Sequence, residues 1–221
     1  MPCVLISDEL SPNATEIFES RGLKVDRKIG LTPEQLLSEI EDYDGLAIRS
    51  ATKVTPEVIS RAKNLKVVGR AGIGVDNIAV DVASAAGVVV MNTPFGNAVT
   101  TAEHTISMIC SLAREITTAD RSTQAGKWEK SRFMGTELTG KNLGIVGCGN
   151  IGSIVADRAQ GLKMRVLAFD PYLSEERAVE LGVRKVDEEI LFSQSDFITL
   201  HTPLTASTKG LVNADSIAKM K

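Results

Sequence analysis

The 221-residue sequence lacks any long hydrophobic run, and its charge has no dominant sign. No apolar stretch approaches the ~18 residues that a membrane span requires, and we find no signal peptide at the start. Lys and Arg number 25 against 28 Asp and Glu, and the two signs are interspersed. This balance gives no basic footprint for nucleic acid or for an anionic membrane. We therefore expect a cytoplasmic globular protein without nucleic-acid or membrane partners.

Cysteine and histidine are also scarce, which limits the chemistry that the chain can carry. Cys3, Cys110 and Cys148 lie far apart, without the spacing of metal ligands, as is typical of proteins from a reducing compartment. We predict no metal site. Of the two histidines, we expect His104 to pack on a helix and His201 to line a cofactor pocket, so neither is predicted to be catalytic.

The strongest positive signal is a short apolar run that ends in regularly spaced glycines. Residues 143–146 have the composition of a buried parallel strand, and Gly147, Gly149 and Gly152 follow at G-x-G-x-x-G spacing, before a predicted helix at 151–161. The first glycine permits a sharp turn, the second lets a pyrophosphate approach the backbone, and the third lets the helix pack closely. The N-terminus of the helix would offer N–H groups to the phosphates.

An acidic residue follows the next predicted strand, at 165–169. This residue is Asp170, at the position where dinucleotide-binding folds hold the adenosine ribose. Its carboxylate would accept hydrogen bonds from the ribose hydroxyls and repel the 2′-phosphate of NADP. The sequence therefore predicts NAD as the cofactor.

The rest of the chain is organised around this unit. Up to about residue 95, short apolar strands alternate with helices that begin at Pro12, Pro33 and Pro56, which is the pattern of a parallel, doubly wound sheet. From 98 to about 118 we predict one long helical segment without a strand. The fold class is α/β, with a flavodoxin-like domain at 1–97. Residues 98–221 are expected to form the first half of a Rossmann-type domain, beginning with that interdomain helix.

Several motifs resemble, in order and over essentially the whole chain, the D-isomer-specific 2-hydroxyacid dehydrogenases. They are Arg49-Ser50-Ala51-Thr52-Lys53-Val54-Thr55, Gly69-Arg70-Ala71-Gly72-Ile73-Gly74-Val75-Asp76-Asn77, Met91-Asn92-Thr93-Pro94, Lys127-Trp128, Phe133-Met134-Gly135-Thr136-Glu137-Leu138 and His201-Thr202-Pro203-Leu204. The resemblance implies an NAD-dependent oxidoreductase that transfers hydride from a small 2-hydroxy acid.

The resemblance also implies where the substrate binds. The expected substrate-binding residues are Arg49, Arg70, Gly72, Ile73, Gly74 and Asn97. Arg49 and Arg70 each end a strand, so we expect both guanidinium groups in a single crevice, paired with phosphate or carboxylate oxygens. The glycines at 72 and 74 would form a turn whose N–H groups hold a carboxylate. Ile73 departs from the family, in which threonine can occur beside the nicotinamide.

The same resemblance extends to the cofactor and the reaction. The expected cofactor-binding residues are Gly147, Gly149, Asn150, Ile151, Gly152, Asp170, His201, Thr202 and Pro203. The implied reaction is the oxidation of 3-phospho-D-glycerate to 3-phosphohydroxypyruvate, the first step of serine biosynthesis. Another acid of the family, such as glyoxylate or hydroxypyruvate, is the nearer alternative, and an NAD-sensing corepressor is the more distant one.

No catalytic residue is assigned within these 221 residues. The family's catalytic arginine, glutamate and histidine are expected in motifs beyond Lys221, so the chain by itself is predicted to be inactive and to be part of a longer dehydrogenase. The resemblance further implies a homodimer or higher homo-oligomer, formed through the long helix and the loop after it.

Overall fold

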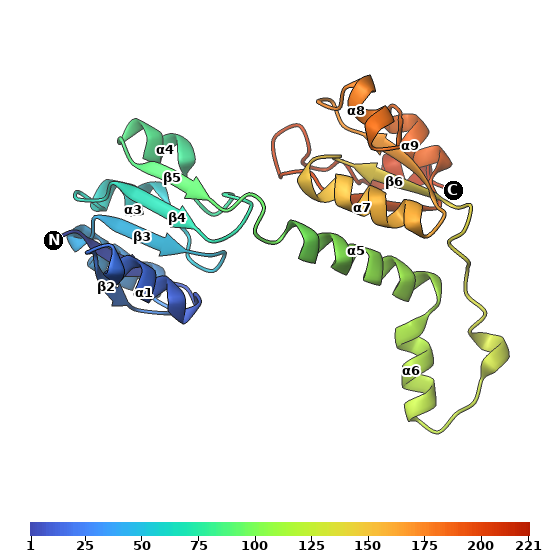
Figure 1. Cartoon of the computed structure of the whole chain (residues 1–221), viewed down its shortest axis with the longest axis horizontal. Coiled ribbons are helices and arrows are strands. Elements are labelled where there is room, and N and C mark those ends of the chain that lie inside the picture. Colours follow the sequence, from blue (N-terminus) through green and yellow to red (C-terminus); the bar gives the residue numbers. More distant parts are fainter. The chain divides into compact units, whose positions relative to one another are not determined.

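The computed structural model describes residues 1–221, which divide into two compact units, Met1–Asn97 and Ala98–Lys221 (Figure 1). Each unit has a sheet made only of parallel strands, with its own hydrophobic core. The expected α/β class is therefore confirmed.

The first unit is a five-stranded sheet with helices on both faces. The strands are β1 (Cys3–Ile6), β2 (Lys24–Arg27), β3 (Gly45–Ile48), β4 (Val67–Arg70) and β5 (Val89–Asn92); the helices are α1 (Pro12–Ser20), α2 (Pro33–Glu39), α3 (Pro56–Arg61) and α4 (Val80–Ala85), with a 3-10 turn η1 (Ile40–Asp42). The strand order β2-β1-β3-β4-β5 is the flavodoxin-like order predicted from the alternation.

Alternating side chains of the strands bury the two faces of this sheet. Leu5 and Leu46 pack with the apolar residues of α2, α3 and α4, whereas Val4 and Ala47 pack on the side of α1. Helices α1, α2 and α3 start at the predicted prolines. At α2 and α3 a threonine, either Thr32 or Thr55, precedes the proline and accepts a hydrogen bond from the first turn.

The second unit begins with two helices and continues as a four-stranded sheet. The helices are α5 (Ala98–Ala113), α6 (Ile116–Gln124), η2 (Lys130–Arg132), α7 (Asn150–Gly161), α8 (Glu175–Glu180), α9 (Glu188–Gln194) and α10 (Ala214–Ala218); the strands are β6 (Asn142–Val146), β7 (Arg165–Phe169), β8 (Arg184–Lys185) and β9 (Phe197–Leu200). Their order, β8-β7-β6-β9, is one mononucleotide-binding half of a Rossmann-type sheet plus the first strand of the other half.

The central strand β6 is buried on both faces. Leu143 and Ile145 belong to the core that includes α7 and α5, while Val146 packs with Leu191 and Phe192 of α9. This sandwiching explains why the run is continuously apolar rather than alternating. It also fixes the end of β6, and therefore the glycine turn that follows it.

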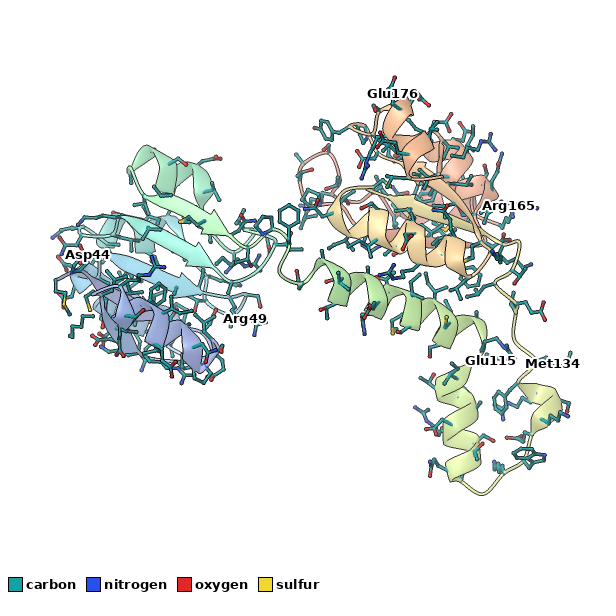
Figure 2. All side chains as sticks on the ribbon, in the orientation of Figure 1. Asp44, Arg49, Glu115, Met134, Arg165 and Glu176 are labelled. Atoms are coloured by element: carbon teal, nitrogen blue, oxygen red, sulfur yellow. The ribbon has the colours of Figure 1, made fainter.

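The predicted single helix over 98–118 is wrong in one respect, because it is two helices. Helix α5 ends at Ala113, and Glu115 adopts a left-handed backbone conformation with φ of 53° before α6 begins. The returning chain takes over the end of α5, since the Thr136 N–H donates to the Ala113 carbonyl at 2.7 Å. Figure 2 labels Glu115 at the bend and Met134 on the returning segment. Helical periodicity in the sequence cannot predict a contact with residues some twenty positions later.

Candidate functional site

The glycine turn lies where the strand order of the second sheet reverses. Strand β6 has β7 on one side and β9 on the other, and the turn leads from β6 into α7. In an open parallel sheet this reversal opens a crevice at the carboxyl ends of the strands, which is the usual ligand position. The predicted cofactor residues all follow β6, β7 or β9 at this edge.

Two glycines of the turn are required by the chain itself. Gly147 has a φ of +87°, and a Cβ there would lie 2.8 Å from the carbonyl oxygen of His201 and from a methyl group of Thr202. Its N–H donates to the Phe169 carbonyl at 2.9 Å. At Gly152 a Cβ would overlap the carbonyl oxygen of Gly147, so the first turn of α7 packs directly on the glycine turn.

Gly149 is different, because no protein atom requires it to be glycine. Its φ is −77°, and a Cβ built there would meet nothing within 4 Å. It is the N-cap residue of α7, and no side chain caps this helix. The bare backbone and the N-terminus of a twelve-residue helix therefore face open space, an arrangement that fits a pyrophosphate held by backbone N–H groups and the helix dipole. Asn150 and Ile151 are the first residues of that helix.

Asp170 is fixed beside this turn by backbone hydrogen bonds. One carboxylate oxygen accepts the N–H of Cys148 at 2.8 Å, and the other accepts the N–H of Tyr172 at 2.8 Å. A carboxylate oxygen has two lone pairs, so each oxygen can still accept from a ribose hydroxyl. The residues present therefore fit a dinucleotide whose ribose carries free hydroxyls.

The end of β9 forms the other wall of the turn. The His201 N–H donates to the Val146 carbonyl at 2.8 Å, which ties His201 to the end of β6. Its imidazole Nε2 lies 3.1 Å from the Thr199 hydroxyl, and burial lowers the pKa of His201, so the ring is neutral at neutral pH. Thr202 contacts the glycine turn, while Pro203 lies further out and is exposed. His201 therefore has the surroundings expected of a pocket-wall residue.

The carboxyl edge of the first sheet carries a separate hollow of about 300 Å³. It is lined by residues that follow β1, β3, β4 and β5, among them Glu9, Arg49, Gly72 and Asn97. Glu9 is ion-paired with Arg27. Arg49 is exposed and forms no ion pair, so its guanidinium is free to meet an anion. Three of the residues predicted for the substrate thus come together here.

Arg70 does not share this hollow, contrary to the expectation of one crevice for both guanidinium groups. Its side chain is only 11% exposed, and it donates to the Gly74 carbonyl and lies 3.3 Å from the Asp76 carboxylate. The chain folds back between Arg70 and Asp76, and this turn brings acceptors to the guanidinium that spacing along the sequence did not indicate. The buried Arg70 Nε has no protein partner.

The turn after β4 differs from the predicted carboxylate nest. The N–H of Gly72 already donates to the Arg70 carbonyl at 2.9 Å, so it is not a free donor. The Ile73 carbonyl accepts from the Asn92 side chain at 2.7 Å. A Cβ at Gly74 would lie 2.8 Å from Arg70 Nη1 and from Asp76 Oδ1. A side chain at position 74 would therefore displace the Arg70 guanidinium or the Asp76 carboxylate from its present place.

The histidine of α5 differs from its prediction. His104 is exposed on α5 rather than packed, because the buried face of that helix is formed by Ala102, Ile109 and Ala113. No group of histidine, cysteine, aspartate or glutamate side chains could hold a metal ion. None of the helices has the length and hydropathy needed to cross a membrane.

Sequence reasoning missed two residues that contact the loop of Arg49, although neither lines the hollow itself. Asp8, which follows β1, and Asn77, which follows the turn after β4, both bind the backbone of the loop that carries Arg49. The available signal for Asp8 was its position, because an acidic residue directly after a buried strand lies at the carboxyl edge of the sheet. Asn77 stood within a motif but carried no assigned role.

Comparison with known proteins agrees with this geometry. The family model for the NAD binding domain of D-isomer specific 2-hydroxyacid dehydrogenases matches residues 106–221. The D-3-phosphoglycerate dehydrogenase of Archaeoglobus fulgidus is 47% identical over 218 residues, which cover 99% of this chain and 41% of that protein. The chain thus spans less than half the length of this curated relative.

Solved structures share the fold over the whole chain. The NAD⁺-bound 3-phosphoglycerate dehydrogenase of Entamoeba histolytica matches with a TM-score of 0.82 and 31% identity, covering 100% of this chain and 68% of that one. A glyoxylate reductase from Paecilomyes thermophila matches with a TM-score of 0.90 and 27% identity, covering 100% of this chain and 70% of that one.

Proposed function

Because this chain belongs to the D-isomer specific 2-hydroxyacid dehydrogenases, we propose that the protein oxidises 3-phospho-D-glycerate to 3-phosphohydroxypyruvate with NAD, the first step of serine biosynthesis. The observation that carries the proposal is the bare backbone at Gly149 beside the fixed carboxylate of Asp170. The choice of substrate is supported by the name of the relatives that are nearly half identical over the whole chain.

In this proposal the second unit, 98–221, holds the cofactor. The glycine turn and the N-terminus of α7 bind the pyrophosphate, and Asp170 accepts hydrogen bonds from the adenosine ribose. Thr202 and Pro203 line the cofactor pocket on the side of the adenine. His201, neutral and bonded to Thr199, contributes a wall of the pocket rather than a proton. When bound, the nicotinamide supplies the acceptor for the hydride from C2 of the hydroxy acid.

The first unit, 1–97, binds the acid. Arg49, which has no acidic partner, pairs with the phosphate or carboxylate of the substrate, and Asn97, which lines the same hollow, donates a hydrogen bond to it. Arg70 supports the turn of Gly72, Ile73 and Gly74 from beneath. No residue of the chain is assigned the general acid/base role, so the hydroxyl proton is not traced further.

A substrate profile tests this proposal. The protein, at its full natural length, is assayed for NADH formation with 3-phosphoglycerate and with unphosphorylated D-glycerate, and for NADH consumption with glyoxylate and hydroxypyruvate. We expect 3-phosphoglycerate to give the highest kcat/KM. A higher kcat/KM with glyoxylate or hydroxypyruvate would favour the second candidate, a reductase of such acids, whose fold the chain shares. NAD binding without turnover of any acid would leave the corepressor interpretation.

We further propose that the protein is a homodimer and acts in the cytoplasm. The second unit exposes large apolar side chains on α5, on α6 and on the segment after α6: Met108, Leu112, Ile116, Trp128 and Met134. No residue of α6 is buried. Exposed apolar surface of this kind is often a site of protein–protein contact. Three unpaired cysteines agree with a reducing compartment.

A further inference from the structure

We propose that Asp8 and Asn77 are positioning residues that hold the loop at 49–52 from both sides and so aim Arg49 at the anionic group of the substrate. This inference rests on the proposed function in one respect, namely that Arg49 binds the anion. Neither residue belongs to the assignments made from the sequence.

Asp8 takes the N–H groups of the loop. One of its carboxylate oxygens accepts the backbone N–H of Arg49 at 2.6 Å and that of Thr52 at 3.1 Å, and the other accepts the Thr52 hydroxyl at 2.8 Å. Asp8 is only 6% exposed and forms no ion pair with a lysine or arginine. A buried carboxylate needs several hydrogen-bond donors in place of water. All the donors that bind the Asp8 carboxylate belong to this loop.

Asn77 takes the carbonyl groups of the same two residues. Its side-chain nitrogen donates to the Arg49 carbonyl at 2.8 Å and to the Thr52 carbonyl at 2.6 Å. Its own backbone carbonyl accepts the N–H of Val54 at 2.8 Å. The polar groups of the Arg49 backbone are therefore occupied on both sides, by residues that come from two different strand ends.

The Arg49 side chain contrasts with its backbone. The guanidinium is exposed and lacks an ionic partner, while the peptide groups next to it are held by two other segments of the sheet edge. Figure 2 labels Arg49 beyond the end of β3. Fixing the backbone during folding means that little of the loop's conformational entropy remains to be lost when an anion binds, which favours tight binding. Asn77 also joins this loop to the turn under which Arg70 packs, so the two segments move together.

Asp8→Asn tests the inference because it keeps the shape of the side chain but turns one acceptor into a donor, which then opposes the N–H groups of the loop. The matched control is Asp44→Asn. Asp44 lies at the opposite end of β3, and its carboxylate likewise accepts a backbone N–H, that of Cys3 at 2.9 Å. Steady-state kinetics of the full-length protein are measured for both variants, alone and combined with Arg49→Ala.

We expect Asp8→Asn to raise the KM for 3-phosphoglycerate about tenfold and to leave the KM for NAD unchanged, since a misplaced guanidinium weakens binding of the acid alone. Asp44→Asn should change neither constant. In the Arg49→Ala background Asp8→Asn should add less than about a twofold change, because its effect acts through Arg49. An undiminished effect in that background would overturn the inference.

Hydrogen exchange gives a readout that needs no turnover. We expect the backbone N–H groups of Arg49 and Thr52 to exchange faster in Asp8→Asn than in the wild type, and to be unaffected in Asp44→Asn. Unchanged exchange in Asp8→Asn would overturn the inference. If the wild type fails to oxidise 3-phosphoglycerate, the proposed function fails, and these exchange rates alone decide whether the loop is held as proposed.

Discussion

At the scale of single residues, the glycines of the turn after β6 fall into two groups, those that the packing of the protein requires and one that it does not. Gly147 and Gly152 satisfy the protein, because a Cβ at either position would collide with backbone atoms. The protein itself does not require Gly149, because nothing of the protein lies within 4 Å of the place where its Cβ would be. Substitutions at these three glycines can therefore separate an effect on stability from an effect on the proposed binding of NAD.

Gly149→Ala should bind NAD at least about tenfold more weakly than the wild type, because the methyl group occupies the surface on which the pyrophosphate rests. Its melting temperature should stay within a few degrees of the wild-type value. Gly147→Ala should instead lower the free energy of unfolding by about 2 kcal/mol or more, through its left-handed backbone and the overlap with His201. Calorimetric titration and thermal unfolding distinguish the two. Equal NAD affinity of Gly149→Ala and the wild type would contradict this account.

His201 makes stability depend on pH near neutrality. Burial lowers its pKa below the ordinary value of about 6.5 that it has in the unfolded chain. The unfolded state therefore binds the proton more readily, and stability falls as the pH drops through about 6.5 toward the pKa of the folded protein. His201→Gln should flatten this fall between about pH 7 and 5. Melting temperatures across this range, without cofactor, provide the measurement, and identical slopes for the wild type and His201→Gln would be the contrary result.

At the scale of elements, local signals in the sequence were mostly sufficient to locate the helices and strands. β7 has the bounds predicted at 165–169, and α2 and α3 begin at the predicted prolines, Pro33 and Pro56. Ser174, Asp187 and Asn213 cap α8, α9 and α10 with their side chains, as is typical of these residue types. The start of a strand or helix depends on residues that are neighbours along the chain, so it can be predicted from a single sequence.

The features that could not be predicted depend on contacts between distant segments. The break at Glu115 coincides with a hydrogen bond from Thr136, and the burial of Arg70 follows from a turn that brings Gly74 and Asp76 back to its guanidinium. The roles of Asp8 and Asn77 likewise need strand ends that are neighbours only in the folded sheet. Charge and spacing predicted which edge of each sheet carries the candidate site. They could not show which side chains at that edge already bind other groups of the protein.

The left-handed conformation of Glu115 should cost stability, which substitution can recover. A non-glycine residue at φ of 53° loses about 1–2 kcal/mol, and glycine recovers part of this at an entropic cost of about 0.5–1 kcal/mol. We expect Glu115→Gly to leave the free energy of unfolding unchanged or to raise it by up to about 1 kcal/mol. Glu115→Val should lower it, since a β-branched residue tolerates this region least. Urea denaturation measures both variants, and the bend is not strained if they behave alike.

At the scale of the whole molecule, each unit has its own sheet, core and candidate site. The hollow that Arg49 lines lies at the carboxyl edge of the first sheet, and the glycine turn lies at that of the second. The exposed apolar side chains of α5, α6 and the following segment belong to neither edge. They are therefore available for association without using the glycine turn of their own unit.

Ile116→Asp should dissociate the proposed homodimer. Ile116 is 51% exposed on α6, and a buried unpaired carboxylate at an interface is strongly unfavourable. The matched control is Ile17→Asp on α1, where the isoleucine is 58% exposed but lies outside the apolar surface of the second unit. Sedimentation velocity should give a dimer for the wild type and for Ile17→Asp and a monomer for Ile116→Asp. A wild-type monomer, or dimers for all three proteins, would refute the proposed interface.

The most direct test of the account as a whole is calorimetric titration of the protein with NAD and with NADP, for the wild type and for Asp170→Ser. We expect the wild type to bind NAD at least about tenfold more tightly than NADP, because the Asp170 carboxylate accepts from the ribose hydroxyls and repels a 2′-phosphate. Asp170→Ser should lose most of this preference, chiefly by weaker binding of NAD. Equal binding of the two nucleotides by the wild type, or binding of neither, would contradict the assignment of this edge of the sheet to NAD.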